Sequence, residues 1–334
     1  MKKLSNKIID SCLKLPIILI LISSFPGPLV PKAASQQFFL SGQHVTFDSS
    51  DQGVDSVKFT VLIDNYPSGT LNAPWGLSIF IETTNLTILF DTGPDPDALR
   101  ENVEKLDMNL DQIDLVMISH GHADHIEGLS YIAEQVQGIT VFVPAFMSSS
   151  VKQRITSWNI TTEEIDSTYS ISDDIAIIGG LYYPVNEQAL VVNVKGLGLI
   201  IFAGCSHPGV DKIVQKAIDD LGIQPYAVIG GFHLVEADVG AITGLVDELL
   251  AKNLTKICPT HCSGDTIRNY LQTNYPSHYE EIKVGYSTIF QGNGPTTSGL
   301  TTATESADSP GFEFFFATGG LISLLAITKK KKLQ

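Results

Sequence analysis

The sequence predicts an α+β fold in which two β-sheets pack against each other and helices cover the outer faces. Within residues 55–292, the first half is dominated by apolar runs paired as hairpins, and the second half by alternating strands and helices. No glycine-rich phosphate loop follows a predicted strand, which argues against a doubly wound nucleotide-binding sheet. Two packed sheets with external helices accommodate both halves.

Apolar runs bounded by turn residues define the elements of the first half. Residues 57–63 are predicted to form a strand, which ends at the turn-rich residues 64–69. Residues 77–82 and 87–90 are predicted to form a hairpin around the polar pair 84–85. The remaining elements of this half are a helix over 96–106, a strand over 113–118, a helix over 126–136, a strand over 140–143 and a helix over 147–158.

The second half alternates strands with amphipathic helices. In the helix predicted over 210–221, apolar residues recur on one face, and Gly222 is the expected end. The other predicted elements are helices over 241–250 and 265–271, and strands over 175–178, 189–194, 199–202, 226–229, 256–258 and 283–290.

The start of the chain predicts export. Residues 1–34 have the features of a signal peptide: early lysines, the apolar core Leu15–Ile22 and the small pair Ala33-Ala34. This core is shorter than the roughly 20 residues that span a bilayer. Cleavage near Ala34 is therefore expected, rather than an uncleaved anchor.

The other end predicts attachment to the cell surface. Residues 293–310 are rich in Gly, Ser, Thr and Pro and predict a flexible stalk. Residues 311–334 combine an apolar stretch with four lysines, and resemble the sorting signals that a membrane transpeptidase recognises on prokaryotic surface proteins. The alternative is a plain C-terminal membrane anchor. In both cases the lysines stay in the cytoplasm and the folded domain, residues 55–292, lies outside.

The charge distribution argues against a nucleic-acid partner. The formal net charge is −15, and nine of the 21 basic residues are lysines near the two ends. The central part therefore carries 12 basic and 34 acidic residues, a net charge of −22. Such a surface repels nucleic acid and anionic membranes. A small-molecule substrate is the expected partner, and the sequence does not predict an oligomeric state.

Cysteine usage argues against a disulfide scaffold. Cys12 lies in the signal segment, which leaves an odd number, Cys205, Cys258 and Cys262, in the domain. Two of these three lie close to histidines. We therefore interpret them as site or packing residues.

The stretch 119–125 brings four metal-competent side chains together: His120, His122, Asp124 and His125. In a helix, His120 and His122 would point about 200° apart. At the end of a strand, residues i and i+2 project to the same side, so both imidazoles converge on one ion with Asp124 and His125 just beyond. The spacing predicts two ions side by side; a solvated His-rich loop that binds nothing is the alternative.

Three later strand ends each present a histidine. His207 lies in a strand-to-helix turn and is either a ligand or a capping or core residue. His233 follows two glycines and either contacts substrate, carries a proton or has a structural role. His261 again lies just past a strand. Beside His207, Cys205 either bridges two ions as a thiolate or packs as a small apolar residue.

These residues and their order resemble the metallo-β-lactamase superfamily. Asp91-Thr92-Gly93, the His-x-His-x-Asp-His run at 120–125 and His261 match the superfamily's order across residues 55–292. Further segments resemble a subfamily of prokaryotic metal-dependent hydrolases that includes ribofuranosylaminobenzene-phosphate dihydropterin synthases: 61–66, 76–78, 204–207, 230–234 and 260–262. The resemblance implies an αββα sandwich.

The resemblance also implies a binuclear metal centre. Each of two divalent ions is expected to be held by three side chains: His120, His122 and His207 for one, and Asp124, His125 and His261 for the other. Asp91 is expected to orient a ligand from behind. Cys205 sits where the superfamily usually has a bridging aspartate. Zinc suits imidazole-rich sites, and iron or manganese are the alternatives.

The function implied is hydrolysis of an ester, phosphodiester or related substrate by a metal-activated water. Asp124 is expected to orient this water or move its proton, and His233 is the second candidate catalytic residue. One alternative is a transferase of the dihydropterin synthase type, whose phosphorylated pterin substrates are cytoplasmic. The other is a non-catalytic surface module that kept the fold for binding.

Overall fold

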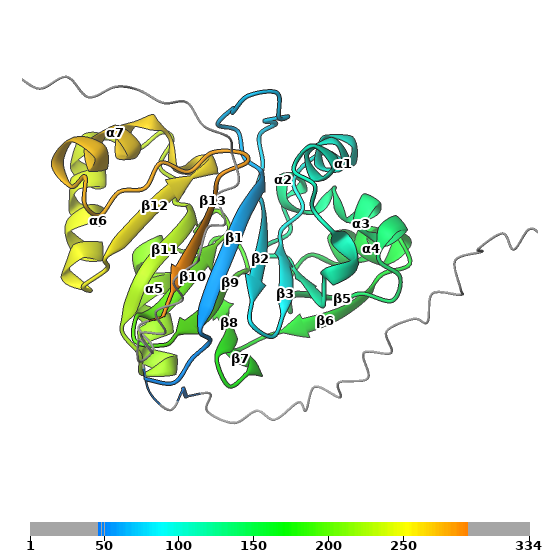
Figure 1. Cartoon of the computed structure of the whole chain (residues 1–334), viewed down its shortest axis with the longest axis horizontal. Coiled ribbons are helices and arrows are strands. Elements are labelled where there is room, and N and C mark those ends of the chain that lie inside the picture. The colour runs from blue at the N-terminus through cyan, green and yellow to red at the C-terminus, as the bar shows by residue number, and fades with distance from the viewer. Residues whose placement is uncertain (1–45, 48, 50, 293–334) are drawn as a thin grey trace, which may run out of the picture. The chain divides into compact units, whose positions relative to one another are not determined.

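Two β-sheets lie against each other, and helices cover their outer faces (Figure 1). This computed structural model describes residues 46–292 except 48 and 50. The predicted signal peptide, stalk and C-terminal segment lie outside the described residues. Among the residues described, no helix has the length and apolar character needed to cross a membrane.

The described residues form one sheet of seven strands and one of six. The first sheet has the order β13 (Ser287–Gln291), β1 (Ser56–Ile63), β2 (Ser78–Thr83), β3 (Thr87–Phe90), β4 (Leu115–Met117), β5 (Thr140–Pro144) and β6 (Thr161–Ile165). The second has the order β12 (Lys256–Thr260), β11 (Pro225–Gly231), β10 (Gly198–Ala203), β9 (Glu187–Val194), β8 (Ile175–Leu181) and β7 (Tyr169–Ser172).

The helices divide between the two sheets. Those packed beside the first sheet are α1 (Pro96–Lys105), α2 (Ala123–Ile126), α3 (Leu129–Gln135) and α4 (Ser149–Ser157). Those beside the second are α5 (Val210–Leu221), α6 (Val239–Ala251) and α7 (Asp265–Asn274). The predicted two-sheet arrangement with external helices is confirmed.

The central core lies between the sheets. Both contribute fully buried side chains, and Phe59 of β1 meets Phe202 of β10 edge-on with ring centroids 5.6 Å apart. Burial of such aromatic side chains removes large apolar areas from water and holds the two sheets together. Separate apolar clusters join each sheet to its own helices.

The candidate site residues follow the carboxyl ends of parallel strands. In the first sheet, β3 and β4 pair in parallel, and Asp91 and Ser119 lie just beyond them. In the second sheet, β10, β11 and β12 run parallel, and Gly204, Phe232 and His261 come directly after them. Carboxyl ends of parallel strands meet at one sheet edge, so both sheets deliver side chains to one place.

Residues 126–136 do not form the single predicted helix. The helix instead starts at Ala123, and Gly128 separates α2 from α3. A Cβ at Gly128 would lie 2.1 Å from the carbonyl oxygen of Thr92, so the chain passes against the loop after β3. This close backbone approach requires glycine, and the change of direction breaks the helix.

Two strands were not predicted, and two are shorter than predicted. The sequences of β6 and β7 are polar and lie at the sheet edges, where a strand needs little apolar surface. The strands expected over 113–118 and 283–290 are limited to β4 and β13. Apolar residues of the two flanking segments, such as Ile113 and Val284, are buried outside the strands.

We expect Phe59→Ala to lower the free energy of unfolding by about 3–5 kcal/mol, because it leaves a cavity between the sheets. Chemical denaturation followed by circular dichroism measures this. Val239→Ala is the control: its side chain is 58% exposed, and the expected change is within about 0.5 kcal/mol. A similar loss in both variants would contradict this account of the core.

Candidate metal centre

His120 and His122 extend from the end of β4 on the same side. Their rings are 4.6 Å apart, and His120 Nε2 lies 3.0 Å from His122 Nδ1. His120 is fully buried, whereas His122 lies at the exposed rim. Burial and the neighbouring histidines lower the pKa of His120 well below its usual value, and burial also lowers that of His122. Both imidazoles are therefore neutral at neutral pH, as metal binding requires.

The buried carboxylate of Asp91 organises this end of the first sheet. It accepts hydrogen bonds from the Ser119 backbone N–H, the Ser119 hydroxyl and His125 Nδ1, each at 2.7 Å. Because the Ser119 hydroxyl donates to Asp91, its oxygen accepts from His120 Nδ1, 2.9 Å away. The Nε2 atom of His120 is then left with a lone pair facing the site.

Asp124 and His125 lie in the first turn of α2, directly beyond this pair. Burial lowers the pKa of His125, but the charge and hydrogen bond of Asp91 outweigh it and raise the pKa to about 9. His125 Nε2 points to Cys205 Sγ at 3.3 Å and to Asp124 Oδ2 at 3.7 Å. Burial raises the pKa of Asp124, but His261 and His125 together lower it below its usual range. Asp124 is therefore an ionised ligand candidate.

His207 is held by Glu187, a carboxylate that the sequence analysis did not identify. Glu187 is buried and accepts from His207 Nδ1 at 3.0 Å, and from the backbone N–H groups of Ser206 and His207 at 2.7 and 2.8 Å. The signal available was an acidic residue two positions before the apolar run Ala189–Val192. His207 thus turns Nε2 away from Glu187, and its ring lies 4.7 Å from that of His120.

His261 is held by two residues that follow β1. Its Nδ1 donates to Asn65 Oδ1 at 2.9 Å, and its backbone N–H donates to Asp64 Oδ1 at 3.1 Å. Burial raises the pKa of Asp64 to about 6, although hydrogen bonds from Thr260 and His261 oppose this. The Nε2 atom of His261 is buried without a hydrogen-bond partner, with Asp124 Oδ2 3.4 Å away.

Three cysteines in the described residues are free and buried, and two of them lie at the site. Cys205 Sγ belongs to every potential donor group, including one with His233 and Cys262. A hydrogen bond from the Cys205 thiol lowers the pKa of Cys262. Burial raises the pKa of Cys262, whereas a hydrogen bond from His233 lowers it further. Cys258 lies apart in the core between the sheets, where burial raises its pKa to about 12.

Donor atoms from both sheets form two neighbouring groups. The potential ligand atoms in each lie within 4.8 Å of one another: Asp124, His125, Cys205 and His261 in one, and His120, Cys205 and His207 in the other. Exposed His122 lies beside the second group and has ring contacts with His120 and His207. The structure thus brings together all six predicted ligands. Their metal-binding role remains a prediction.

The donor set fits divalent metal ions. Four histidines have Nδ1 held by another residue and direct Nε2 into the site: His120 by Ser119, His125 by Asp91, His207 by Glu187 and His261 by Asn65. Metal-binding histidines are commonly oriented by such a partner on the other ring nitrogen. The unpartnered, buried Nε2 of His261 needs a ligand of this kind, because an unsatisfied buried polar atom is costly.

Local backbone strain accompanies the site. Asp91, Ser206, His233 and His261 have φ between 49° and 57°. This left-handed region is uncommon for residues other than glycine, and such strain persists where surrounding contacts enforce it. Gly204 is needed for packing instead, because a Cβ there would lie 2.1 Å from Ser119 Oγ.

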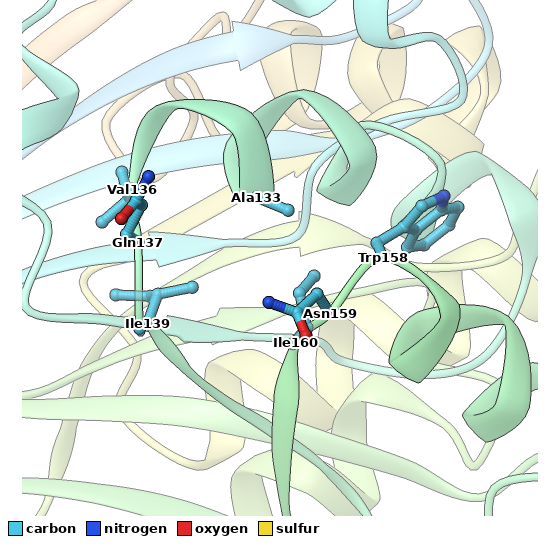
Figure 2. Close-up of a pocket in the computed structure, with 8 residues that line it drawn as sticks. Ala133, Val136, Gln137, Ile139, Trp158, Asn159 and Ile160 are labelled. Carbon is cyan, nitrogen blue, oxygen red and sulfur yellow. The ribbon is translucent and has the colours of Figure 1, made fainter.

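A cavity of about 320 Å³ lies away from these residues. Figure 2 shows it between the end of α3 and the region where α4 ends, with Trp158 and Asn159 on one side. Ile139 and Ile160 line it and precede β5 and β6, so it lies at the amino ends of strands whose carboxyl ends face the site. No histidine, cysteine or carboxylate lines it. It is not the candidate metal centre.

Comparison with known proteins identifies the family. Residues 86–178 match a family model described as the beta-lactamase superfamily domain. The 7,8-dihydropterin-6-methyl-4-(beta-D-ribofuranosyl)-aminobenzene-5'-phosphate synthase of Methanocaldococcus jannaschii is 30% identical over 284 residues, covering 70% of this chain and 96% of the relative. The chain belongs to the metallo-β-lactamase superfamily. Within this superfamily, it is a member of the subfamily that includes this synthase, as the sequence motifs predicted.

Solved structures of other metallo-β-lactamase proteins confirm the fold. Tm1679, a metal-dependent hydrolase of the superfamily, is 22% identical with a TM-score of 0.60, over 70% of this chain and 99% of that one. The metallo-β-lactamase fold protein YhfI of Bacillus subtilis is 14% identical with a TM-score of 0.52, over 71% of this chain and 100% of that one. Both share the two-sheet fold over this part of the chain.

We expect Glu187→Gln to weaken metal binding by about 10–100-fold, because His207 loses the charged partner that orients it. Competition with a chromophoric chelator measures the affinity, and thermal unfolding checks that the fold is retained. The exposed Glu248→Gln on α6 is the matched control, with unchanged affinity. Equal affinities in the two variants would show that Glu187 does not support a ligand.

Proposed function

We propose that this protein is an exported, binuclear metal-dependent hydrolase that acts on an ester, phosphodiester or related small-molecule substrate. The observation that carries the proposal is the convergence of two donor groups on Cys205, with four Nε2 atoms directed into one site by partners behind them. Membership of a superfamily rich in metal-dependent hydrolases supports the reaction class.

Divalent ions held there would supply Lewis acidity and lower the pKa of a water to about 7. The chain's own contribution is positioning. Asp124 lies between His125 and His261, and its side chain is 23% exposed, so it can meet the attacking water and hold its proton. His233 is exposed beside His207, with ring centroids 4.5 Å apart. It is placed to pass a proton to the leaving group.

The donor set narrows the choice of metal. Imidazole nitrogen predominates, with one carboxylate and a central cysteine, and this mixture suits zinc, with iron or manganese as alternatives. Cys205 lies in both groups and is the candidate bridge. Its thiol would have to lose its proton to bind, because only the thiolate is a good ligand.

A transferase reaction is the second candidate, because the 30% identical relative is a synthase. The two candidates differ in the acceptor: water for a hydrolase, and the second organic substrate for a transferase. A product carrying oxygen from labelled water identifies hydrolysis. Formation of a condensed product identifies the transferase: the amino nitrogen of a ribofuranosylaminobenzene phosphate would displace a leaving group from the 6-methyl carbon of a dihydropterin.

We expect the purified protein to bind two equivalents of metal per chain, measured by inductively coupled plasma mass spectrometry. We expect His122→Ala and treatment with a strong chelator each to lower kcat/KM on a 4-nitrophenyl ester or phosphodiester by more than about 100-fold. The histidine lies at the rim and contributes little to the core, so the variant should remain folded.

His278→Ala is the control for this comparison. His278 lies outside the site, where it contacts the carbonyl oxygen of Leu254, and its removal should leave both metal content and kcat/KM nearly unchanged. Full turnover by the chelated protein, or by His122→Ala, would refute the metal-dependent mechanism. Absence of bound metal would favour a non-catalytic binding module.

We propose that the domain lies on the outer side of the cell membrane, on the basis of residues 1–34 and 311–334. Protease added to intact cells is expected to digest the domain while leaving a cytoplasmic marker intact. Removal of residues 1–34 should make the domain resistant by retaining it inside. Resistance in both strains would exclude surface exposure.

A further inference from the structure

Large exposed apolar side chains gather around the candidate metal centre. Among the described residues, seven large apolar side chains are exposed, and four of them lie in loops that contact segments of the site: Trp75, Phe146, Tyr182 and Val235. The exposed fractions of these four range from 49% to 59%. An apolar surface of this kind at one place indicates binding of an apolar group.

Trp75 forms the wall beside Asp124 and His261. Its ring centroid lies 5.0 Å from that of His261. The next residue, Gly76, packs so closely that a Cβ would lie 2.5 Å from the carbonyl oxygen of Asp124, which also accepts from Leu77 N–H at 3.2 Å. The backbone thus fixes Trp75 at the site, while 49% of its side chain stays exposed.

A second aromatic wall adjoins the segments that carry His122 and hold His207. Phe146 and Tyr182 meet edge-on with ring centroids 5.1 Å apart, and Asn186 donates a hydrogen bond to the Phe146 carbonyl oxygen. Asn186 immediately precedes Glu187, which holds His207. Both aromatic side chains are more than half exposed.

Two further contacts connect these exposed apolar residues to the segments that carry the candidate ligands. Met147, next to Phe146, packs against Gly121, the residue between His120 and His122. In the loop after β11, Val235 N–H donates to the Cys262 carbonyl oxygen at 3.2 Å, so the backbone of Val235 lies next to the segment that carries His261. The donor atoms therefore lie inside an apolar rim.

The charges of the metal-loaded site would nearly balance, which favours a neutral ligand. Two divalent ions would bring four positive charges, and the carboxylates of Asp91, Asp124 and Glu187 with a Cys205 thiolate would offset them. In the part of the chain that the structure describes, no lysine or arginine forms a hydrogen bond or ion pair with a candidate metal ligand, whereas Asp91 and Glu187 both do. Lys152, near Phe146, is paired with Glu164 at 2.8 Å. Arg268 is buried and donates to backbone carbonyls. Phosphate-binding sites normally use such cations.

We infer that the substrate is a neutral ester with an aromatic or similarly flat apolar group, which stacks on Trp75 while its carbonyl lies at the donor atoms. This inference rests on the proposed function and narrows its substrate class. Trp75 acts as a specificity-determining residue, and the Phe146–Tyr182 wall receives the other side of the substrate. Phosphate monoesters, with two negative charges, lack a basic partner and bind more weakly.

Tryptophan fluorescence tests binding separately from turnover. The chain has two tryptophans, and Trp158 lies in the distant cavity of Figure 2, so Trp158→Phe leaves Trp75 as the reporter. In the metal-loaded full chain, 4-nitroacetanilide, a neutral aryl amide, should quench Trp75 to saturation. 4-Nitrophenyl phosphate, which carries the same ring, should bind at least about tenfold more weakly.

Substitution of the wall gives the second measurement. Trp75→Ala should weaken 4-nitroacetanilide binding by about tenfold in calorimetry, and lower kcat/KM for 4-nitrophenyl esters by a similar factor through KM. Phe146→Ala should act in the same direction. Val239→Ala is the control, because its side chain is 58% exposed but lies at the start of α6, outside this apolar surface. Rates on bis(4-nitrophenyl) phosphate should change less than rates on the esters.

The outcomes separate the two proposals. The proposal of a neutral aromatic substrate is overturned if Trp75→Ala binds the neutral amide as well as the parent protein does, or if the phosphate binds more tightly than the amide. The protein could still be a hydrolase in that case, which hydrolysis of phosphodiesters would show. Saturable, Trp75-dependent binding without turnover of any ester or phosphodiester supports the apolar site and overturns the hydrolase. Binding and ester turnover that both depend on Trp75 support both.

Discussion

The hydrogen bonds of Asp91 are the constraint on which the centre depends. One buried carboxylate fixes the end of β4 through Ser119 and the first turn of α2 through His125. Through the Ser119 hydroxyl it also sets the orientation of His120. A buried carboxylate requires several donors, so it cannot release one group without leaving its own charge unsatisfied. One side chain therefore fixes the positions of two ligand candidates, His120 and His125, relative to each other.

The histidines that follow strands of the second sheet are also oriented by hydrogen bonds, but from other partners. Glu187 at the start of β9 holds His207, which follows β10, and Asn65 after β1 holds His261, which follows β12. Each histidine is thus oriented by a neighbouring segment rather than by its own loop. A carboxylate partner makes an imidazole more basic than an amide partner does. His207 is consequently expected to be a stronger ligand than His261.

Local signals in the sequence were sufficient for most of the elements and for choosing the ligand candidates. The helix over 210–221 ends at Gly222 in the left-handed conformation, as its periodicity and glycine predicted, and histidines beyond apolar strands marked the site. The partners Glu187, Asn65 and Ser119 were not predictable in the same way. Asn65 and His261 are 196 residues apart, so their contact depends on how the two sheets pack. Similarly, the break at Gly128 arises from contact with the loop after β3.

The placement of donors on both sheets gives the centre a role in stability. An ion held by residues after β4, β10 and β12 would bind the assembled domain and not the unfolded chain, and so stabilise it by mass action. Metal binding would also offset the energetic cost of the left-handed backbone conformation at four residues of the site. The available metal concentration would then set how long the domain resists unfolding and proteolysis, which makes its persistence a measure of metal supply.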